Sequence, residues 1–209
     1  MTQRRVRVKF CGMTREQDIA QAIGLGVDAI GLIFYPKSSR FLSLARAREL
    51  LREIPPFVNA VAVLVNPLAS FVEELIAELP VDYLQFHGEE SLQFCEQFKK
   101  PYIKAVQASS TSIIEKFSKE HPQAAALLLD TPSTSCHGGT EKTFDWGLIP
   151  QHLSKPLILA GGLNADNVAA ALSQCKPYAV DVCSGVEASP GIKDHKKMSR
   201  FVNAVWGKE

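Results

Sequence analysis

The chain has 209 residues, of which 46% are hydrophobic and 22% are charged, and its formal net charge is +1. This composition is typical of a globular protein with one sizeable core, and the balanced charge excludes the broad basic surface that nucleic-acid binding requires. We therefore expect small-molecule partners.

Short apolar runs rich in Val, Ile, Leu and aromatic residues recur along the chain, and amphipathic segments separate them. This alternation is typical of βα units around a parallel sheet. Eight strands are predicted, at 6–10, 29–34, 60–65, 83–86, 102–106, 126–130, 157–160 and 179–182.

The segments between these strands have helical spacing, as in the stripe of Phe71, Leu75 and Leu79. Asn164 is expected to cap the helix that follows the strand at 157–160. Helices are predicted at 15–25, 44–54, 68–79, 91–99, 111–120, 147–153, 166–174 and 193–206.

Eight such units indicate an α/β fold, a (β/α)8 barrel, and no linker or composition shift divides the chain. We predict a single catalytic domain over residues 1–209. A doubly wound open sheet is the main alternative, but no G-x-G-x-x-G follows the first strand. The polar connection at 131–145 is long enough to be a functional loop.

The termini and the cysteines indicate the compartment. Arginines at 4, 5 and 7 are not followed by the apolar stretch of a secretory signal, and no run approaches the roughly 18 apolar residues of a membrane span. The five cysteines are scattered and form no CxxC pair, which favours reduced thiols. The sequence predicts a cytoplasmic protein without membrane contact or a metal site.

Two predicted strands near the C-terminus end in glycine. Gly161 and Gly162 follow one, and Ser184 and Gly185 follow the other. In a barrel these are the loops after strands seven and eight, where backbone N–H groups commonly hold a substrate phosphate. We expect a phosphorylated ligand here, although glycines that only form tight turns are the alternative.

A thiol and a carboxyl group lie at other strand ends. Cys11 follows the first strand beside a glycine, and Asp130 ends the sixth strand after three leucines. A thiol and a carboxyl group facing one pocket would serve as base and acid for two proton transfers. For each residue alone, a structural role, as a buried thiol or as a loop-ordering carboxylate, is the alternative.

Other polar residues lie at the same predicted rim. Arg40 follows the second strand and could clamp a carboxylate, or it could be a solvated loop charge. His87 follows the fourth strand and could bind a ligand or transfer protons, or simply lie at the rim. Lys9 and Asp181 alternate with apolar neighbours, so each could point into the barrel or pair with another charge.

The loop after Asp130 contains two weak motifs. Gly138 to Thr143 superficially resembles a phosphate loop, but Glu141 and Cys136 stand where a Walker A motif has glycine, so ATP binding is rejected. Cys136 and His137 are neighbours without a second ligand pair at metal spacing, which disfavours a metal site.

An ordered set of segments resembles the phosphoribosylanthranilate isomerase family. The match extends from the first strand to the last helix, and the set is specific although each motif is modest. The segments are 9–14, 36–40, 84–88, 129–130, 139–140, 142–146, 160–163, 167–168, 181–187 and 191–194.

The resemblance implies an Amadori rearrangement in tryptophan biosynthesis, without metal or organic cofactor. N-(5-phosphoribosyl)anthranilate would become 1-(o-carboxyphenylamino)-1-deoxyribulose 5-phosphate. Asp130 would protonate the furanose ring oxygen, and Cys11 would take the proton from C2′ of the resulting Schiff base.

The resemblance also implies binding roles. Arg40 would hold the anthranilate carboxylate, and the glycines with Ser184 would receive the phosphate. From its position after the fourth strand, His87 is also predicted to bind the substrate. The family usually has glycine where this chain has Glu141, which leaves the shape of that loop open. Monomer or homodimer is left open.

Three alternatives remain to be weighed. Another phosphosugar barrel enzyme would share the phosphate site but not Cys11 and the Arg40 segment. A non-catalytic phosphate-ligand sensor would not need the pair of Cys11 and Asp130. An enzyme with Cys11 as nucleophile and His87 as base would form a covalent intermediate.

Overall fold

A computed structural model describes residues 5–132 and 143–207, and these form a closed barrel of eight parallel strands. Each strand pairs with the next, and the last pairs with the first, which confirms the predicted (β/α)8 fold. The strands are β1 (Arg7–Phe10), β2 (Ala29–Ile33), β3 (Asn59–Leu64), β4 (Tyr83–Phe86), β5 (Tyr102–Gln107), β6 (Ala126–Asp130), β7 (Leu157–Leu159) and β8 (Ala179–Val182).

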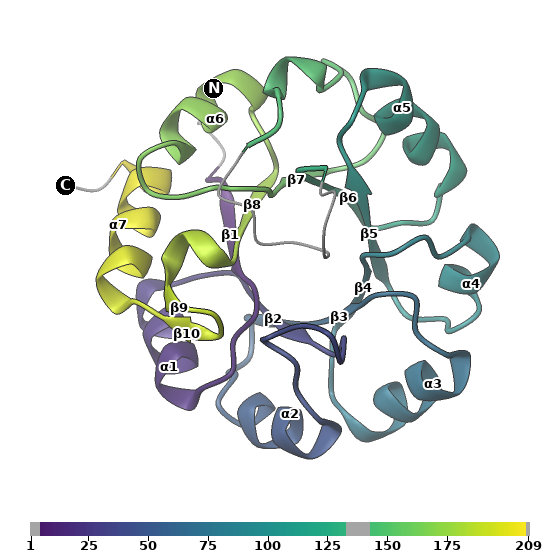
Figure 1. The fold of residues 1–209 in the computed structure, drawn as a ribbon, viewed down its shortest axis with the longest axis vertical. Coiled ribbons are helices and arrows are strands. Elements are labelled where there is room, and N and C mark those ends of the chain that lie inside the picture. Colours follow the sequence, from purple (N-terminus) through teal and green to yellow (C-terminus); the bar gives the residue numbers. More distant parts are fainter. Residues whose placement is uncertain (1–4, 133–142, 208–209) are drawn as a thin grey trace.

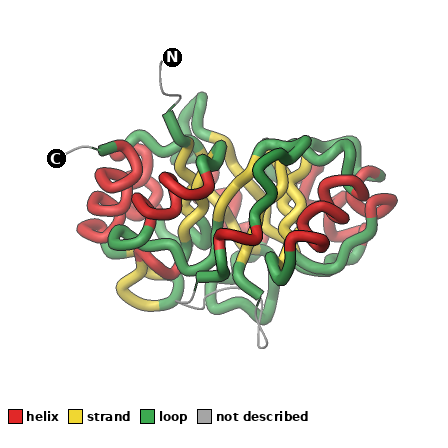
Figure 2. The backbone as a smooth tube through the Cα atoms, turned by 90° about the horizontal axis from the view of Figure 1, so that it is seen from above, coloured by secondary structure: helices red, strands yellow, loops and turns green. Residues whose placement is uncertain are grey.

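The helices form a ring outside the barrel (Figure 1), and the side view has the strands enclosed between them (Figure 2). Several begin at a serine or aspartate whose side chain accepts a backbone N–H, such as Ser43, Ser110 and Asp194. They are α1 (Glu16–Leu25), α2 (Leu44–Leu51), α3 (Ala69–Glu78), α4 (Leu92–Glu96), α5 (Thr111–Glu120), α6 (Val168–Cys175) and α7 (His195–Trp206).

The helix predicted at 147–153 is wrong. Only a 3-10 turn, η1 (Trp146–Leu148), forms there. Pro150 lacks a backbone N–H, and in a longer helix its ring would clash with the carbonyl group of Trp146. The crossover between β6 and β7 therefore has no α-helix among its described residues.

Two other departures lie near the C-terminal ends of the last strands. Helix α6 begins later than expected, but Asn164 still caps the turn before it: its Oδ1 accepts the N–H groups of Asp166 at 2.9 Å and Asn167 at 3.1 Å. A 3-10 turn and a small hairpin after β8 were not predicted. They are η2 (Ser184–Val186), β9 (Glu187–Ser189) and β10 (Ile192–Lys193).

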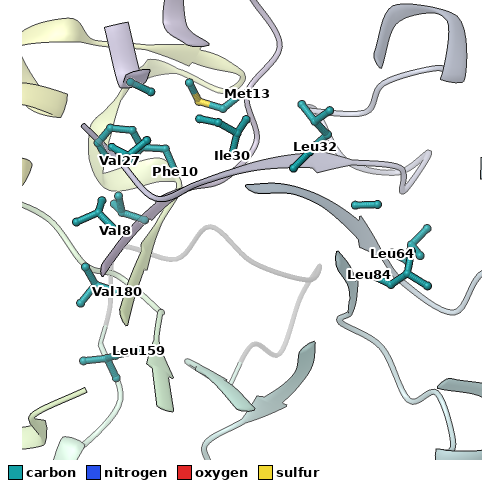
Figure 3. Packing of buried hydrophobic residues seen from close by; sticks show 14 of the residues in the cluster. Val8, Phe10, Met13, Val27, Ile30, Leu32, Leu64, Leu84, Leu159 and Val180 are labelled. Carbon is teal, nitrogen blue, oxygen red and sulfur yellow. The ribbon is translucent and has the colours of Figure 1, made fainter. Parts of the chain in front are cut away.

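Strand alternation divides the core into two layers. On β1, Val8 and Phe10 point outward against the helices, as Figure 3 shows together with Ile30 of β2 and Val180 of β8. Inward-facing residues fill the barrel in a second, smaller apolar cluster that includes Leu128. Side chains that alternate with the outward-facing ones point into the barrel. At the C-terminal ends of the strands they therefore reach the barrel mouth.

No helix in the described part of the chain combines the length and the apolar character that crossing a membrane requires.

Phe86 at the end of β4 is fully buried, and its ring contacts those of Phe94, Phe98 and Tyr102 at centroid distances of 5.9, 6.1 and 5.9 Å. We expect Phe86→Ala to lower the free energy of unfolding by about 3–5 kcal/mol, because it leaves a cavity in the outer layer. Urea-induced unfolding followed by circular dichroism measures this. Leu68→Ala, at a side chain that is 76% exposed, is the matched control; an equal loss in both variants would contradict the prediction.

Candidate active site

One pocket at the barrel mouth brings together the predicted catalytic and substrate-binding residues, whereas Lys9 does not line it. It is formed by the C-terminal ends of the strands and the loops that follow them. The predicted site residues that line it are Cys11, Arg40, His87, Asp130, Gly161, Gly162, Ser184 and Gly185.

The in-register pairing of β1 and β8 forms one wall of this pocket. Lys9 lies opposite Asp181 in the ladder, and its Nζ is 2.9 and 3.0 Å from the two carboxylate oxygens. One step further along, the backbone N–H of Cys11 donates to the carbonyl oxygen of Val182 at 2.9 Å. This register directs Cys11 and Cys183 to the same inner face, where their thiols form a side-chain hydrogen bond.

The two thiols have opposite electrostatic surroundings. The hydrogen bond with Cys183 and burial raise the pKa of Cys11, although Lys9 lowers it. The same hydrogen bond lowers the pKa of Cys183; burial opposes this, and Lys193 and Arg40 reinforce it. These surroundings therefore favour the thiolate at Cys183 over the thiolate at Cys11.

A second pair of titratable groups lies on the opposite wall. His87 Nε2 is 3.1 Å from Asp130 Oδ2, and His87 Nδ1 is 2.9 Å from the side-chain amide nitrogen of Gln85. Asp130 Oδ1 accepts the backbone N–H of Thr131 at 2.7 Å. Burial works against protonation of His87, but the hydrogen bond to Asp130 and the charges of Asp130, Cys11 and Asp181 together outweigh it, so the pKa of His87 is raised.

Arg40 reaches the pocket but is not a free cation. Its Nε and Nη2 donate to the two carboxylate oxygens of Glu187 at 2.8 and 2.6 Å. Lys193 Nζ also donates to Glu187, at 2.9 Å, and to the carbonyl oxygen of Cys183 at 3.0 Å. This bidentate pair fixes the orientation of the guanidinium plane at the rim.

The glycines allow close approach of neighbouring loops. A Cβ at Gly185 would overlap the carbonyl oxygen of Leu163, so the loop after β8 lies directly against the loop after β7. Gly161 has a φ of 81°, and a Cβ there would lie 2.9 Å from Asp130 Oδ1.

Three residues of the site were missed by reasoning from sequence. Cys183 could have been found, because it follows Asp181 by two residues and so continues the inward-facing alternation just past the end of β8. Glu187 and Lys193 gave no signal, since their contact with Arg40 depends on the unpredicted hairpin of β9 and β10.

Some predictions fall outside the described residues. Cys136, His137 and Glu141 belong to the segment 133–142, so the departure at Glu141 is not addressed by the structure. Within residues 5–132 and 143–207, no cluster of three or more His, Cys, Asp or Glu side chains could hold a metal ion.

Asp130→Asn is expected to lower the pKa of His87 below its ordinary value of 6.5, because burial then acts without the opposing carboxylate. A histidine whose pKa is raised in the folded state contributes stability that is fully present below pH 6.5 and is lost as pH rises through the folded pKa. The variant should lose this dependence. NMR titration of the imidazole resonances measures the pKa, with His87→Gln for assignment.

Asp166→Asn is the matched control, since this exposed carboxylate pairs with Arg200 at 3.0 Å, far along the chain from His87. It should leave the titration of His87 unchanged. An unchanged titration in Asp130→Asn would contradict the prediction.

Comparison with known proteins agrees with this geometry. The family model for N-(5'-phosphoribosyl)anthranilate (PRA) isomerase matches residues 8–204. An N-(5'-phosphoribosyl)anthranilate isomerase of Legionella pneumophila (strain Lens) is 61% identical over 207 residues, which cover 99% of this chain and 100% of that protein.

Solved structures give the same result. The crystal structure of phosphoribosyl anthranilate isomerase from Thermotoga maritima superposes with a TM-score of 0.87 at 37% identity, covering 97% of this chain and 99% of that one. A phosphoribosyl anthranilate isomerase in complex with reduced 1-(o-carboxyphenylamino)-1-deoxyribulose 5-phosphate has a TM-score of 0.83 at 36% identity, with the same coverage. This chain therefore belongs to the N-(5'-phosphoribosyl)anthranilate isomerase family.

Proposed function

We propose that this chain catalyses the Amadori rearrangement of N-(5-phosphoribosyl)anthranilate to 1-(o-carboxyphenylamino)-1-deoxyribulose 5-phosphate in tryptophan biosynthesis. The observation that carries the proposal is the joint presence of Cys11 and Asp130 in the pocket whose rim includes the glycine loops after β7 and β8. We assign the activity to one domain, residues 1–209. A cytoplasmic location and a monomeric or homodimeric state stay predictions.

Asp130 is the general acid in this proposal. It donates a proton to the furanose ring oxygen, the C1′–O bond breaks, and a Schiff base forms between C1′ and the anthranilate nitrogen. His87 Nε2 lies 3.1 Å from Asp130 Oδ2 and orients the carboxyl group in the pocket. Gly161 supports this role, because its missing side chain leaves room around Asp130.

Cys11 is the general base. Its thiolate takes the proton from C2′ of the Schiff base, which gives an enolamine. Proton return at C1′ and loss of the C2′ hydroxyl proton then convert the enolamine into the ketone, so the sequence is an isomerisation with no net gain or loss of atoms. A positioned proton transfer of this kind contributes about 10²–10⁴-fold to the rate.

Arg40 is assigned to the anthranilate carboxylate. Glu187 occupies its Nε and Nη2 edge, so the Nη1 side is the one we assign to the substrate. Because the guanidinium is already oriented, little side-chain entropy is lost when the carboxylate binds. The phosphate is assigned to the backbone around Gly162, Ser184 and Gly185, which line the same pocket.

The rival mechanism with Cys11 as nucleophile and His87 as its base is disfavoured by the contacts of the imidazole. One ring nitrogen binds Asp130 and the other lies at the amide of Gln85, so neither is directed at the thiol. A covalent intermediate under turnover, detected by mass spectrometry, would favour the rival.

Cys11→Ala and Asp130→Asn should each lower kcat/KM by at least about 10², because each removes one of the two proton transfers. The measurement is the loss of phosphoribosylanthranilate fluorescence during turnover. Cys95→Ala is the control, since this buried thiol lies in α4 away from the pocket. Full activity of either Cys11→Ala or Asp130→Asn would reject the proposed mechanism.

Arg40→Lys should raise KM by about tenfold or more with a smaller change in kcat, because lysine keeps the charge but loses the planar, bidentate contact. Steady-state kinetics with the same fluorescence signal separate the two constants. Arg46→Lys is the matched control at an exposed arginine that pairs with Glu16 and Glu49. An unchanged KM in Arg40→Lys would reject the assignment of Arg40 to the substrate carboxylate.

A further inference from the structure

A buried lysine lies directly beneath Cys11. Lys9 precedes Cys11 by two residues on β1, so both side chains point to the inside of the barrel. The side chain of Lys9 is only 4% exposed, and its described ion pair is with Asp181 of β8. Burying a charged ammonium group costs free energy even when it is paired. We therefore expect a functional role of Lys9 in addition to its packing.

Gly31 of β2 brings the ammonium and the thiol together. A Cβ at Gly31 would lie 2.9 Å from Cys11 Sγ and 3.0 Å from Lys9 Nζ, so both atoms occupy the space that a side chain would fill. The charge of Lys9 also lowers the pKa of Cys11. Strand β1 therefore supplies both the ammonium and the thiol, and Gly31 of β2 leaves room for them.

The groups that face Cys11 come from four parts of the barrel. Besides Lys9, they are Asp181 on β8, Cys183 directly after it, His87 after β4 and Arg40 in the loop after β2. Both Lys9 and Asp181 act on Cys11 through charge, and the lowering of its pKa by Lys9 exceeds the raising by Asp181.

We propose that Lys9, held in place by Asp181, is a positioning residue that stabilises the thiolate of Cys11 and so keeps the base in its reactive form. The proposal rests on the assignment of Cys11 as general base.

The two thiols have different cations beside them. Lys193 and Arg40 lower the pKa of Cys183, whereas Lys9 lowers the pKa of Cys11 against the raising effects of Cys183 and burial. Lys9 is therefore the cation that favours the thiolate at Cys11.

The double variant Lys9→Met/Asp181→Asn tests the proposal, because it removes both charges and leaves no unpaired ion. Iodoacetamide labelling from pH 5 to 10, with peptide mass spectrometry, gives the rate at Cys11. We expect the rate at pH 7 to fall by about tenfold or more and its midpoint to move to higher pH, since a cation within hydrogen-bond reach lowers a thiol pKa by about one unit or more. The pH profile of kcat/KM should shift in the same direction.

The matched control is Lys104→Met/Glu90→Gln. This pair is equally buried, with Nζ and Oε2 2.7 Å apart, but it comes from β5 and the loop after β4 and does not face Cys11. It should lower stability by circular dichroism and leave the labelling midpoint of Cys11 unchanged. An unchanged midpoint in the folded Lys9 variant would overturn the proposal.

A second measurement removes the thiol partner. In Cys183→Ser, Cys11 should titrate at lower pH than in the parent protein, and adding Lys9→Met/Asp181→Asn to this variant should move the midpoint back up, because Lys9 lowers the pKa of Cys11. The absence of that upward move would also overturn the proposal. Labelling does not depend on turnover, so full activity of Cys11→Ala would reject the base role without deciding the effect of Lys9 on the thiol.

Discussion

The pairing of β1 with β8 is the contact on which the rest of the site depends. It joins residues about 172 positions apart, and its register sets Lys9 against Asp181. Because side chains alternate along a strand, the same register puts Cys11 beside Cys183 at the mouth. A shift of either strand by one residue would turn its two groups into the outer apolar layer, away from their partners on the other strand.

Charge burial at the mouth serves orientation more than stability. Lys9 with Asp181, and Arg40 with Glu187 and Lys193, are largely withdrawn from water, and buried ion pairs of this kind contribute little net stability. These ion pairs hold the three cations at fixed positions around Cys11 and Cys183 at the barrel mouth. Such preorganisation suits a reaction in which negative charge forms and moves within the site.

The missing side chain of glycine makes room for a different group at each of three positions in the site. Gly31 leaves room for a thiol and an ammonium, Gly161 leaves room for a carboxylate, and Gly185 lets two loops touch. The phosphate interpretation concerned the loops after β7 and β8, and it remains an assignment by position. The sequence did not predict the role of Gly31. A glycine within a strand indicates only that the strand is locally weakened or that another group approaches its backbone closely.

Residue pattern alone predicted the eight strands, the closed barrel and the strand ends that carry Cys11 and Asp130, because alternation and apolar runs are local properties of the chain. The helix at 147–153 was wrong because Pro150 outweighed its apolar spacing. Only the tertiary structure decided the partners: Cys183 for Cys11, His87 for Asp130 and Glu187 for Arg40. Each of these contacts crosses between strands or loops, and its geometry is set by barrel closure and hairpin packing, which no local spacing records.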